Sequence, residues 1–162
     1  NYGIGSDGRV GMYVEEKNRA WTSSNADNDN QAVTIEVAND VIGGNWHVSD
    51  KALAKLIDLC TDICKRNGIK KLNFTGDKNG NLTMHKYFAA TACPGAYLES
   101  KFPYIANEVN KRLAKNSENS LDDDLALLVK KGVINTPSYW KTKAPTVQYL
   151  PELIHKMALA LR

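Results

Sequence analysis

Residues 84–95 read Met-His-Lys-Tyr-Phe-Ala-Ala-Thr-Ala-Cys-Pro-Gly, and no other stretch of the chain carries comparable chemistry. His85 and Cys93 bring an imidazole and a thiol, two side chains that zinc prefers, into one short segment. Pro94 and Gly95 predict a sharp turn that places the sulfur of Cys93 at the edge of a loop. The residue types alone leave a second interpretation open, in which His85 is a core histidine and Cys93 a buried free thiol.

The first part of the chain predicts strands. Residues 2–4 and 10–14 flank Asp7-Gly8, a hairpin signal, because the favoured two-residue turns need positive φ at their central residues. Residues 33–37 alternate between apolar and polar side chains as a half-buried strand does. Glu36 therefore lies on the strand face opposite the apolar residues, and it need not belong to the core.

Helices are predicted between and after these strands. Ser49 is a good N-cap, and the helix that follows should end at Asn67-Gly68, because glycine accepts the left-handed cap conformation. A strand is expected near residues 71–74, and Pro103 is expected to open a further helix. These elements together predict an α/β fold, with a mixed central β-sheet flanked by helices.

The composition is that of a globular chain of 162 residues, 43% of them hydrophobic, enough for one ordinary domain and a small appendage. No apolar run approaches the length of a membrane-spanning helix, and no signal peptide is visible. A net charge of only +3, spread through both halves, argues against a dedicated nucleic-acid binder, which would show a concentrated basic face. Three cysteines do not make a disulfide framework. Cys60 and Cys64 are expected to lie on the apolar face of a helix and to pack in the protein core.

Three segments, taken in order, resemble one family. His85, Cys93 and the Pro-Gly after it look like the second and third zinc ligands of the type-2 N-acetylmuramoyl-L-alanine amidases, a superfamily that includes phage endolysins, autolysins and peptidoglycan recognition proteins. Residues 2–10, followed by residues 15–21, and residues 30–39 resemble, in order and spacing, the amidase domains of clostridial and related phage lysins. The resemblance covers residues 1–114. It implies a zinc-dependent peptidoglycan amidase that hydrolyses the bond between N-acetylmuramic acid and L-alanine.

The resemblance also implies roles for particular residues. His85 and Cys93 would hold Zn²⁺, with a position left open for water. Glu36 matches a strand position at which several bacterial members carry a catalytic base, although the residue alone is equally consistent with an exposed strand carboxylate or an ion-pair partner. Thr91 matches a position that holds lysine or threonine, and its hydroxyl would donate a hydrogen bond to the oxyanion. The substrate-binding residues would be Trp21, Thr22, Ser23 and Asn39.

The chain departs from the family pattern at one zinc ligand. The family's zinc is held by two histidines and a cysteine, or sometimes an aspartate, and the first histidine lies upstream of the hairpin. This chain begins inside that hairpin, and His47 and His155 lie at the wrong places to replace the missing ligand. We therefore expect an N-terminal piece to be absent and the 162-residue chain alone to be inactive or feebly active. A non-catalytic peptidoglycan-binding module is the competing function.

Residues 120–162 are predicted to form a small helical module after a polar linker at residues 115–119. Ser120 would cap its first helix, and helical segments are expected from Thr136-Pro137 and from about Val147. The module resembles helical tails of clostridial cell-wall amidases, less specifically than the first match. A structural cap, wall binding and self-association all stay open as its role, and in the last case the chain would be a helical assembly partner.

The resemblance and the composition together define the expected partners and location. Peptidoglycan, as muropeptide, is the expected partner, and neither nucleic acid nor membrane insertion is expected. The expected source is a phage or prophage of a Gram-positive host. The protein would then be made in the host cytoplasm and would act on the bacterial cell wall.

Overall fold

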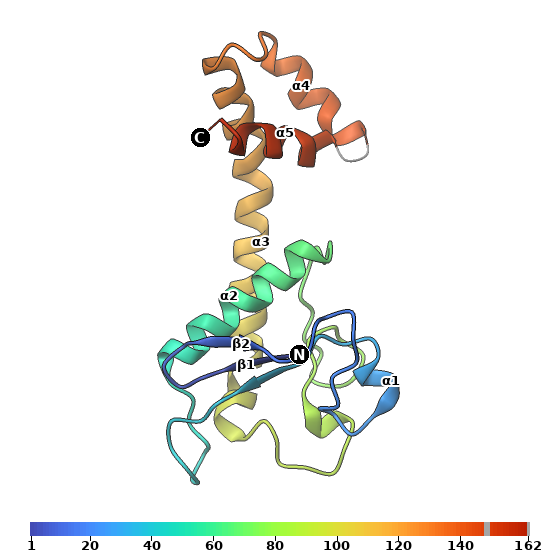
Figure 1. Ribbon diagram of the computed structural model, residues 1–162, viewed down its shortest axis with the longest axis vertical. Helices are drawn as coiled ribbons and strands as arrows, with labels where there is room; N and C mark the ends of the chain where they lie inside the picture. The colour runs from blue at the N-terminus through green and yellow to red at the C-terminus, as the bar shows by residue number, and fades with distance from the viewer. Residues whose placement is uncertain (148–149, 162) are drawn as a thin grey trace. The chain divides into compact units, whose positions relative to one another are not determined.

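The computed structural model describes residues 1–147 and 150–161. Two compact units divide the chain, Asn1–Lys111 and Arg112–Arg162 (Figure 1). The first unit holds the strands and the residues singled out for catalysis. The second unit consists of helical segments with a small core of their own.

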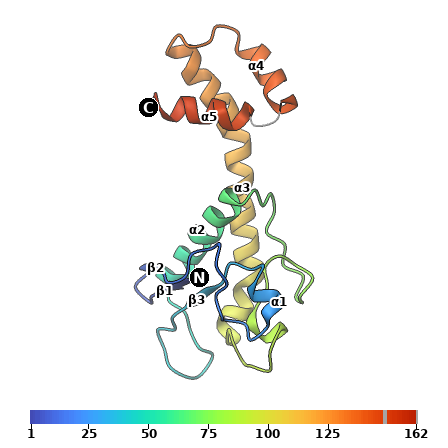
Figure 2. The same ribbon diagram turned by 45° about the vertical axis from the view of Figure 1, so that its right-hand side comes forward.

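A three-stranded mixed sheet forms the centre of the first unit. Its strands are β1 (Tyr2–Ile4), β2 (Val10–Met12) and β3 (Ile35–Val37), in the order β2-β1-β3 (Figure 2). β1 pairs antiparallel with β2 and parallel with β3. The turn between β1 and β2 contains Gly8 at φ 84°, as the Asp7-Gly8 signal predicted. The predicted α/β class, with a mixed sheet flanked by helices, is confirmed.

The two faces of the sheet differ. Gly3 lies between Gly11 and Glu36 in the register, so these three residues direct their side-chain positions to one face. The other face carries Ile4, which is only 2% exposed. Helix α2 (Asp50–Arg66) contacts β1 and lies beside the strands in both views (Figures 1 and 2). Glu36 therefore projects from the face opposite the apolar residues of its strand, as predicted, and it is exposed.

Helix α2 has the ends that the sequence predicts. The Ser49 hydroxyl accepts a hydrogen bond from the backbone N–H of Ala52 at 3.1 Å, which satisfies one of the free donors of the first turn. Gly68 follows the helix at φ 67°. Cys60 and Cys64 are buried on its apolar side, which confirms the expected core packing. Burial raises the pKa of the Cys60 thiol to about 12, with a smaller contribution from Cys64.

Two predicted elements are corrected by the structure. Residues 71–74 form no strand. The side chain of Asn110 forms hydrogen bonds with both backbone groups of Leu72, accepting from its N–H and donating to its carbonyl at 2.8 Å each. These groups are therefore not available to pair with a neighbouring strand. Helix α3 (Ala96–Lys130) begins seven residues before Pro103, which lies inside it. The earlier start brings Leu98 and Phe102 into the core, and that burial offsets the hydrogen bond which proline cannot make.

The expected helix start at Ser120 is also corrected, because the backbone of residues 115–120 belongs to α3. The physical reason is the absence of proline and glycine from residues 104–131, since serine and asparagine lower helix propensity only moderately. The boundary between the two compact units, after Lys111, likewise falls within α3. The predicted division into residues 1–114, 115–119 and 120–162 stays a prediction.

The second unit continues with α4 (Pro137–Lys143), a 3₁₀ turn η2 (Ala144–Thr146) and α5 (Leu150–Leu159). Helix α4 begins at the predicted Thr136-Pro137. The last helix was expected from about Val147, and residues 148–149 lie outside the described part of the chain. The core of this unit consists of Leu125, Leu128, Ala144 and Ile154. Among the described residues, no helix is long and apolar enough to span a membrane.

Candidate active site

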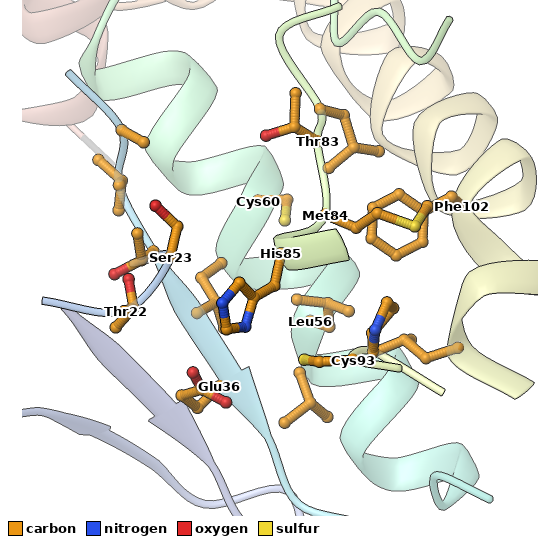
Figure 3. A pocket seen from close by; sticks show the side chains of 18 of the residues that line it. Thr22, Ser23, Glu36, Leu56, Cys60, Thr83, Met84, His85, Cys93 and Phe102 are labelled. Atoms are coloured by element: carbon orange, nitrogen blue, oxygen red, sulfur yellow. The ribbon is translucent and has the colours of Figure 1, made fainter. Parts of the chain in front are cut away.

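A pocket of about 170 Å³ opens beside the edge strand β3. Glu36 of β3, His85 and Cys93 line this pocket together, although nearly sixty residues separate the strand from the cysteine. Figure 3 shows the side chains of these three residues around the same space. The pocket thus brings the three residues with the strongest predicted roles to one place.

His85 opens a short 3₁₀ turn, η1 (His85–Tyr87). The residue before it, Met84, is only 4% exposed and anchors the turn in the core. Lys86 forms an ion pair with Glu99 at 2.8 Å, which ties the same turn to α3. The Nε2 atom of His85 is buried and has no hydrogen-bond partner among the described residues, 1–147 and 150–161. A buried ring nitrogen without a partner is unfavourable unless something else occupies it, so this atom is available to a ligand.

Cys93 is held by the turn that precedes α3. Its peptide bond to Pro94 is cis, and Gly95 follows at φ 86°. A Cβ at Gly95 would lie 2.8 Å from the Cβ of Trp46, so glycine is required there both for its φ and for space. Burial raises the pKa of the Cys93 thiol, and the negative charge of Glu36 raises it further. That effect of Glu36 agrees with its position beside the sulfur in the pocket.

A polar wall made by Thr22, Ser23 and Asn28 lines another side of the pocket. Asp29, only 2% exposed, organises this wall by accepting from the Ser23 hydroxyl at 2.6 Å and from the Ser23 backbone N–H at 2.9 Å. The amide of Asn28 donates to the Ser23 hydroxyl at 2.9 Å. Sequence reasoning predicted Thr22 and Ser23 but missed Asn28 and Asp29. The only local signal for them is Asn25, the N-cap of the short helix α1 (Ala26–Asp29).

Three predicted site residues do not line this pocket. The hydroxyl of Thr91 accepts a hydrogen bond from the backbone N–H of Cys93 at 3.2 Å and so belongs to the turn. Trp21 is 82% exposed, with the Arg19 guanidinium 3.9 Å from its ring centre. The Asn39 amide donates to the backbone carbonyl of Trp46 at 2.7 Å, which closes the loop between them. Their catalytic and binding roles stay predictions.

The donors in the pocket agree with zinc in kind but do not complete a zinc site. The partnerless Nε2 of His85 and the free thiol of Cys93 are an imidazole and a sulfur donor, the types that zinc prefers. Within residues 1–147 and 150–161, however, no group of three or more His, Cys, Asp or Glu residues is placed to hold a metal ion. A zinc centre at this pocket therefore needs a donor in addition to these two.

Comparison with known proteins identifies one family. The family model described as N-acetylmuramoyl-L-alanine amidase matches residues 1–96, more than half of the chain. The matched range contains Glu36, His85 and Cys93. No curated protein and no solved structure gives a significant match.

Proposed function

Since the chain belongs to the N-acetylmuramoyl-L-alanine amidase family, we propose that it hydrolyses the amide bond between N-acetylmuramic acid and L-alanine in peptidoglycan. The observation that carries this proposal is the pocket in which Glu36, His85 and Cys93 converge within the matched residues. A carboxylate, an imidazole and a thiol at one opening are the groups that metal-assisted amide hydrolysis uses.

We propose Zn²⁺ as the cofactor, with the Nε2 atom of His85 and the sulfur of Cys93 as two of its protein ligands. When bound, zinc would polarise the lactyl carbonyl and acidify a water molecule. The third protein ligand, on this proposal, is the upstream histidine that the family resemblance implies. A thiol whose pKa is raised by burial is protonated at neutral pH, so binding of the metal would release the Cys93 proton.

Glu36 is the proposed general base. Its carboxylate would accept the proton of the attacking water and return it to the leaving nitrogen of L-alanine. The strand holds Glu36 at the pocket while leaving it exposed, so its carboxylate is open to incoming substrate. Thr91 is the proposed oxyanion donor. Its hydroxyl oxygen accepts a hydrogen bond from the backbone N–H of Cys93, so the hydroxyl hydrogen is left to donate to the oxyanion. Thr22, Ser23, Trp21 and Asn39 are the proposed substrate contacts.

The finer biological assignment is also a proposal. The order and spacing of the matching segments favour a lysin of the clostridial or phage type, which would act on the cell wall of a Gram-positive host after synthesis in its cytoplasm. Residues 120–162 would then act as a structural cap, in wall binding or in self-association.

The test is the appearance of new alanine amino termini when the protein is incubated with purified Gram-positive peptidoglycan and zinc. We expect release by the wild-type domain extended upstream to include the first histidine. His85→Ala should lose both the release and the bound zinc, whereas the matched variant His47→Ala should keep both, because His47 pairs with Asp40 outside the pocket lining. Cleavage at another bond, or equal activity of the His85→Ala variant, would refute the proposal.

One alternative function is a module that binds muropeptide without cleaving it, since within residues 1–147 and 150–161 only His85 and Cys93 are proposed as zinc ligands at the pocket. Measured binding of muropeptide, with no zinc and no alanine release in the upstream-extended protein, would support this alternative.

A further inference from the structure

The ring of Tyr13 lies over two glycines of the sheet. A Cβ built on Gly3 would be 2.7 Å from the Cε2 atom of this ring, and one built on Gly11 would be 3.3 Å from its Cζ and hydroxyl oxygen. Gly3 and Gly11 are direct partners in the antiparallel pairing of β1 and β2. The backbone N–H of Tyr13 donates to the carbonyl of Asn1 at 2.9 Å, which fixes the residue to the end of the same strand pair.

This ring lies on the same sheet face as Glu36. Gly3 pairs with Gly11 on one side and with Glu36 on the other, and directly opposed residues direct their side-chain positions to one face. Neighbouring strands are about 4.8 Å apart, so the glycines under the ring lie roughly 5–10 Å from the backbone of Glu36. Glu36, which lines the pocket, and the ring of Tyr13 therefore lie on the same face of the sheet.

Glycine at positions 3 and 11 leaves space for the ring of Tyr13 and is not required by the backbone conformation. Neither Gly3 nor Gly11 has a positive φ, so an alanine is compatible with the backbone conformation at both positions. What a side chain at Gly3 would displace is the ring of Tyr13. Glycine within a strand lowers stability, and here it seats an aromatic ring close to the sheet.

The ring of Tyr13 lies over the two glycines, yet the residue is 81% exposed. Tyrosine is enriched at binding interfaces, because its ring offers a large apolar surface to a ligand. Pyranose rings have such a face, made of axial C–H groups, and these groups pack against the electron-rich face of an aromatic ring.

We propose that Tyr13 is a stacking platform for a sugar ring of the glycan strand, next to the muramic acid whose amide bond reaches Glu36. This inference rests on the proposed function and specifies the substrate side of it. The glycan extends across the sheet from Glu36 over Gly3 to Tyr13, and the stem peptide faces the polar wall of Thr22, Ser23 and Asn28. Tyr13 thus contributes selection for a saccharide over a free peptide.

The test measures binding of two probes that lack the scissile bond, the disaccharide GlcNAc–MurNAc and the dipeptide L-Ala–D-isoGln, by calorimetry or ligand-observed NMR. Tyr13→Ala should bind the disaccharide roughly 3- to 10-fold more weakly than the wild type, with dipeptide binding unchanged. Tyr13→Phe retains the ring and should bind within about twofold of the wild type. The matched control is Tyr104→Ala, which removes another exposed tyrosine, from helix α3.

Equal disaccharide affinity of the Tyr13→Ala variant and the wild type would overturn the inference, as would no binding of the disaccharide by the wild type. If Tyr13→Ala does not fold, as judged by thermal unfolding, Tyr13→Leu decides, because leucine covers the glycines without an aromatic face. The amidase proposal can fail independently of this one. If the protein releases no alanine but binds the disaccharide through Tyr13, only the amidase proposal is refuted. Alanine release with sugar binding independent of Tyr13 refutes the platform alone.

Discussion

Glu36 and Glu16 are both carboxylates of the first unit, but their surroundings suit them to different tasks. Glu36 is exposed beside the pocket. Glu16 is bound by the two terminal nitrogens of Arg66 at 2.9 Å each and by the Tyr2 hydroxyl at 2.8 Å. Hydrogen bonds from Arg66 hold the pKa of Glu16 well below its ordinary value and so keep this carboxylate in its charged form. The two carboxylates therefore differ in their hydrogen-bond partners and exposure although they carry the same charge.

Replacement of Glu36 by glutamine should separate metal binding from turnover. In the upstream-extended protein, Glu36→Gln should keep its zinc but lose turnover by roughly 10²- to 10⁴-fold, because the amide cannot accept a proton. Zinc per chain and the rate of alanine release are the two measurements. Glu15→Gln, whose native carboxylate pairs with Lys17 on the surface, is the control. Near-normal turnover of Glu36→Gln would leave Glu36 a structural carboxylate.

Glu16 should contribute stability that depends on pH. Hydrogen bonds from Arg66 lower the pKa of Glu16 from 4.5 to about 2. Because the folded-state pKa is the lower one, the contribution is complete above the unfolded value and is lost as pH falls toward 2. We expect Glu16→Gln to lower the free energy of unfolding by about 1 kcal/mol at pH 7, a value reduced for the solvent exposure of Arg66.

The measurement for Glu16 is urea unfolding of the wild type and Glu16→Gln between pH 3 and pH 7. The difference between them should shrink as the pH is lowered. A difference that stays constant over this range would show that the ion pair with Arg66 does not set the pKa of Glu16.

At the scale of elements, segments without regular structure are held by hydrogen bonds to residues distant in the sequence. Residues 71–74 lack a strand partner, yet Leu72 is only 6% exposed, and both of its backbone groups are bonded by Asn110 of α3. The loop before α2 is likewise held, because the carbonyl of Asn45 accepts from the N–H of Tyr97, in the first turn of α3, at 2.9 Å. Both contacts thus connect a loop of the first unit to α3.

Loss of the Asn110 amide should therefore destabilise the first unit. Asn110→Ala leaves a buried N–H and a carbonyl of Leu72 without partners, which should cost about 1–3 kcal/mol of unfolding free energy. Denaturant unfolding measures this change. Lys111→Ala, one position away and involved in an exposed pair with Glu108, should change stability by less than about 0.5 kcal/mol. An equally small effect of Asn110→Ala would show that water replaces its two bonds.

At the scale of the whole molecule, the pocket offers two zinc-type donors and a carboxylate, and a tetrahedral site with an open position needs three protein ligands. The two compact units have separate cores, and every residue of the pocket belongs to the first. The chemistry of the site therefore depends on residues of the first unit and on any further metal ligand that binds at this pocket.

The 162-residue chain with added zinc should accordingly release alanine from peptidoglycan feebly or not at all. Zinc titration by calorimetry should show weak binding that is abolished in the double variant His85→Ala/Cys93→Ser. The upstream-extended protein is the comparison. Full activity of the 162-residue chain would show that one of its own residues completes the site, contrary to the expected upstream histidine.

Local signals in the sequence determined the Asp7-Gly8 turn, both ends of α2, the start of α4 and the side of β3 to which Glu36 points. Each of these depends on residues a few positions apart, through a cap, a positive φ or strand alternation. The family resemblance added the expectation that His85, Cys93 and Glu36 act together, and the pocket holds all three.

Tertiary structure alone decided the rest. Asn110 displaced the expected strand at residues 71–74, and buried Asp29 organised the Ser23 wall. Trp21 and Asn39 came to lie outside the pocket lining, and Tyr13 came to rest over two paired glycines. These outcomes depend on which distant groups meet once the apolar faces are buried. A local sequence pattern does not predict these contacts, because each long-range contact forms only if the whole chain is more stable with it than with the alternatives.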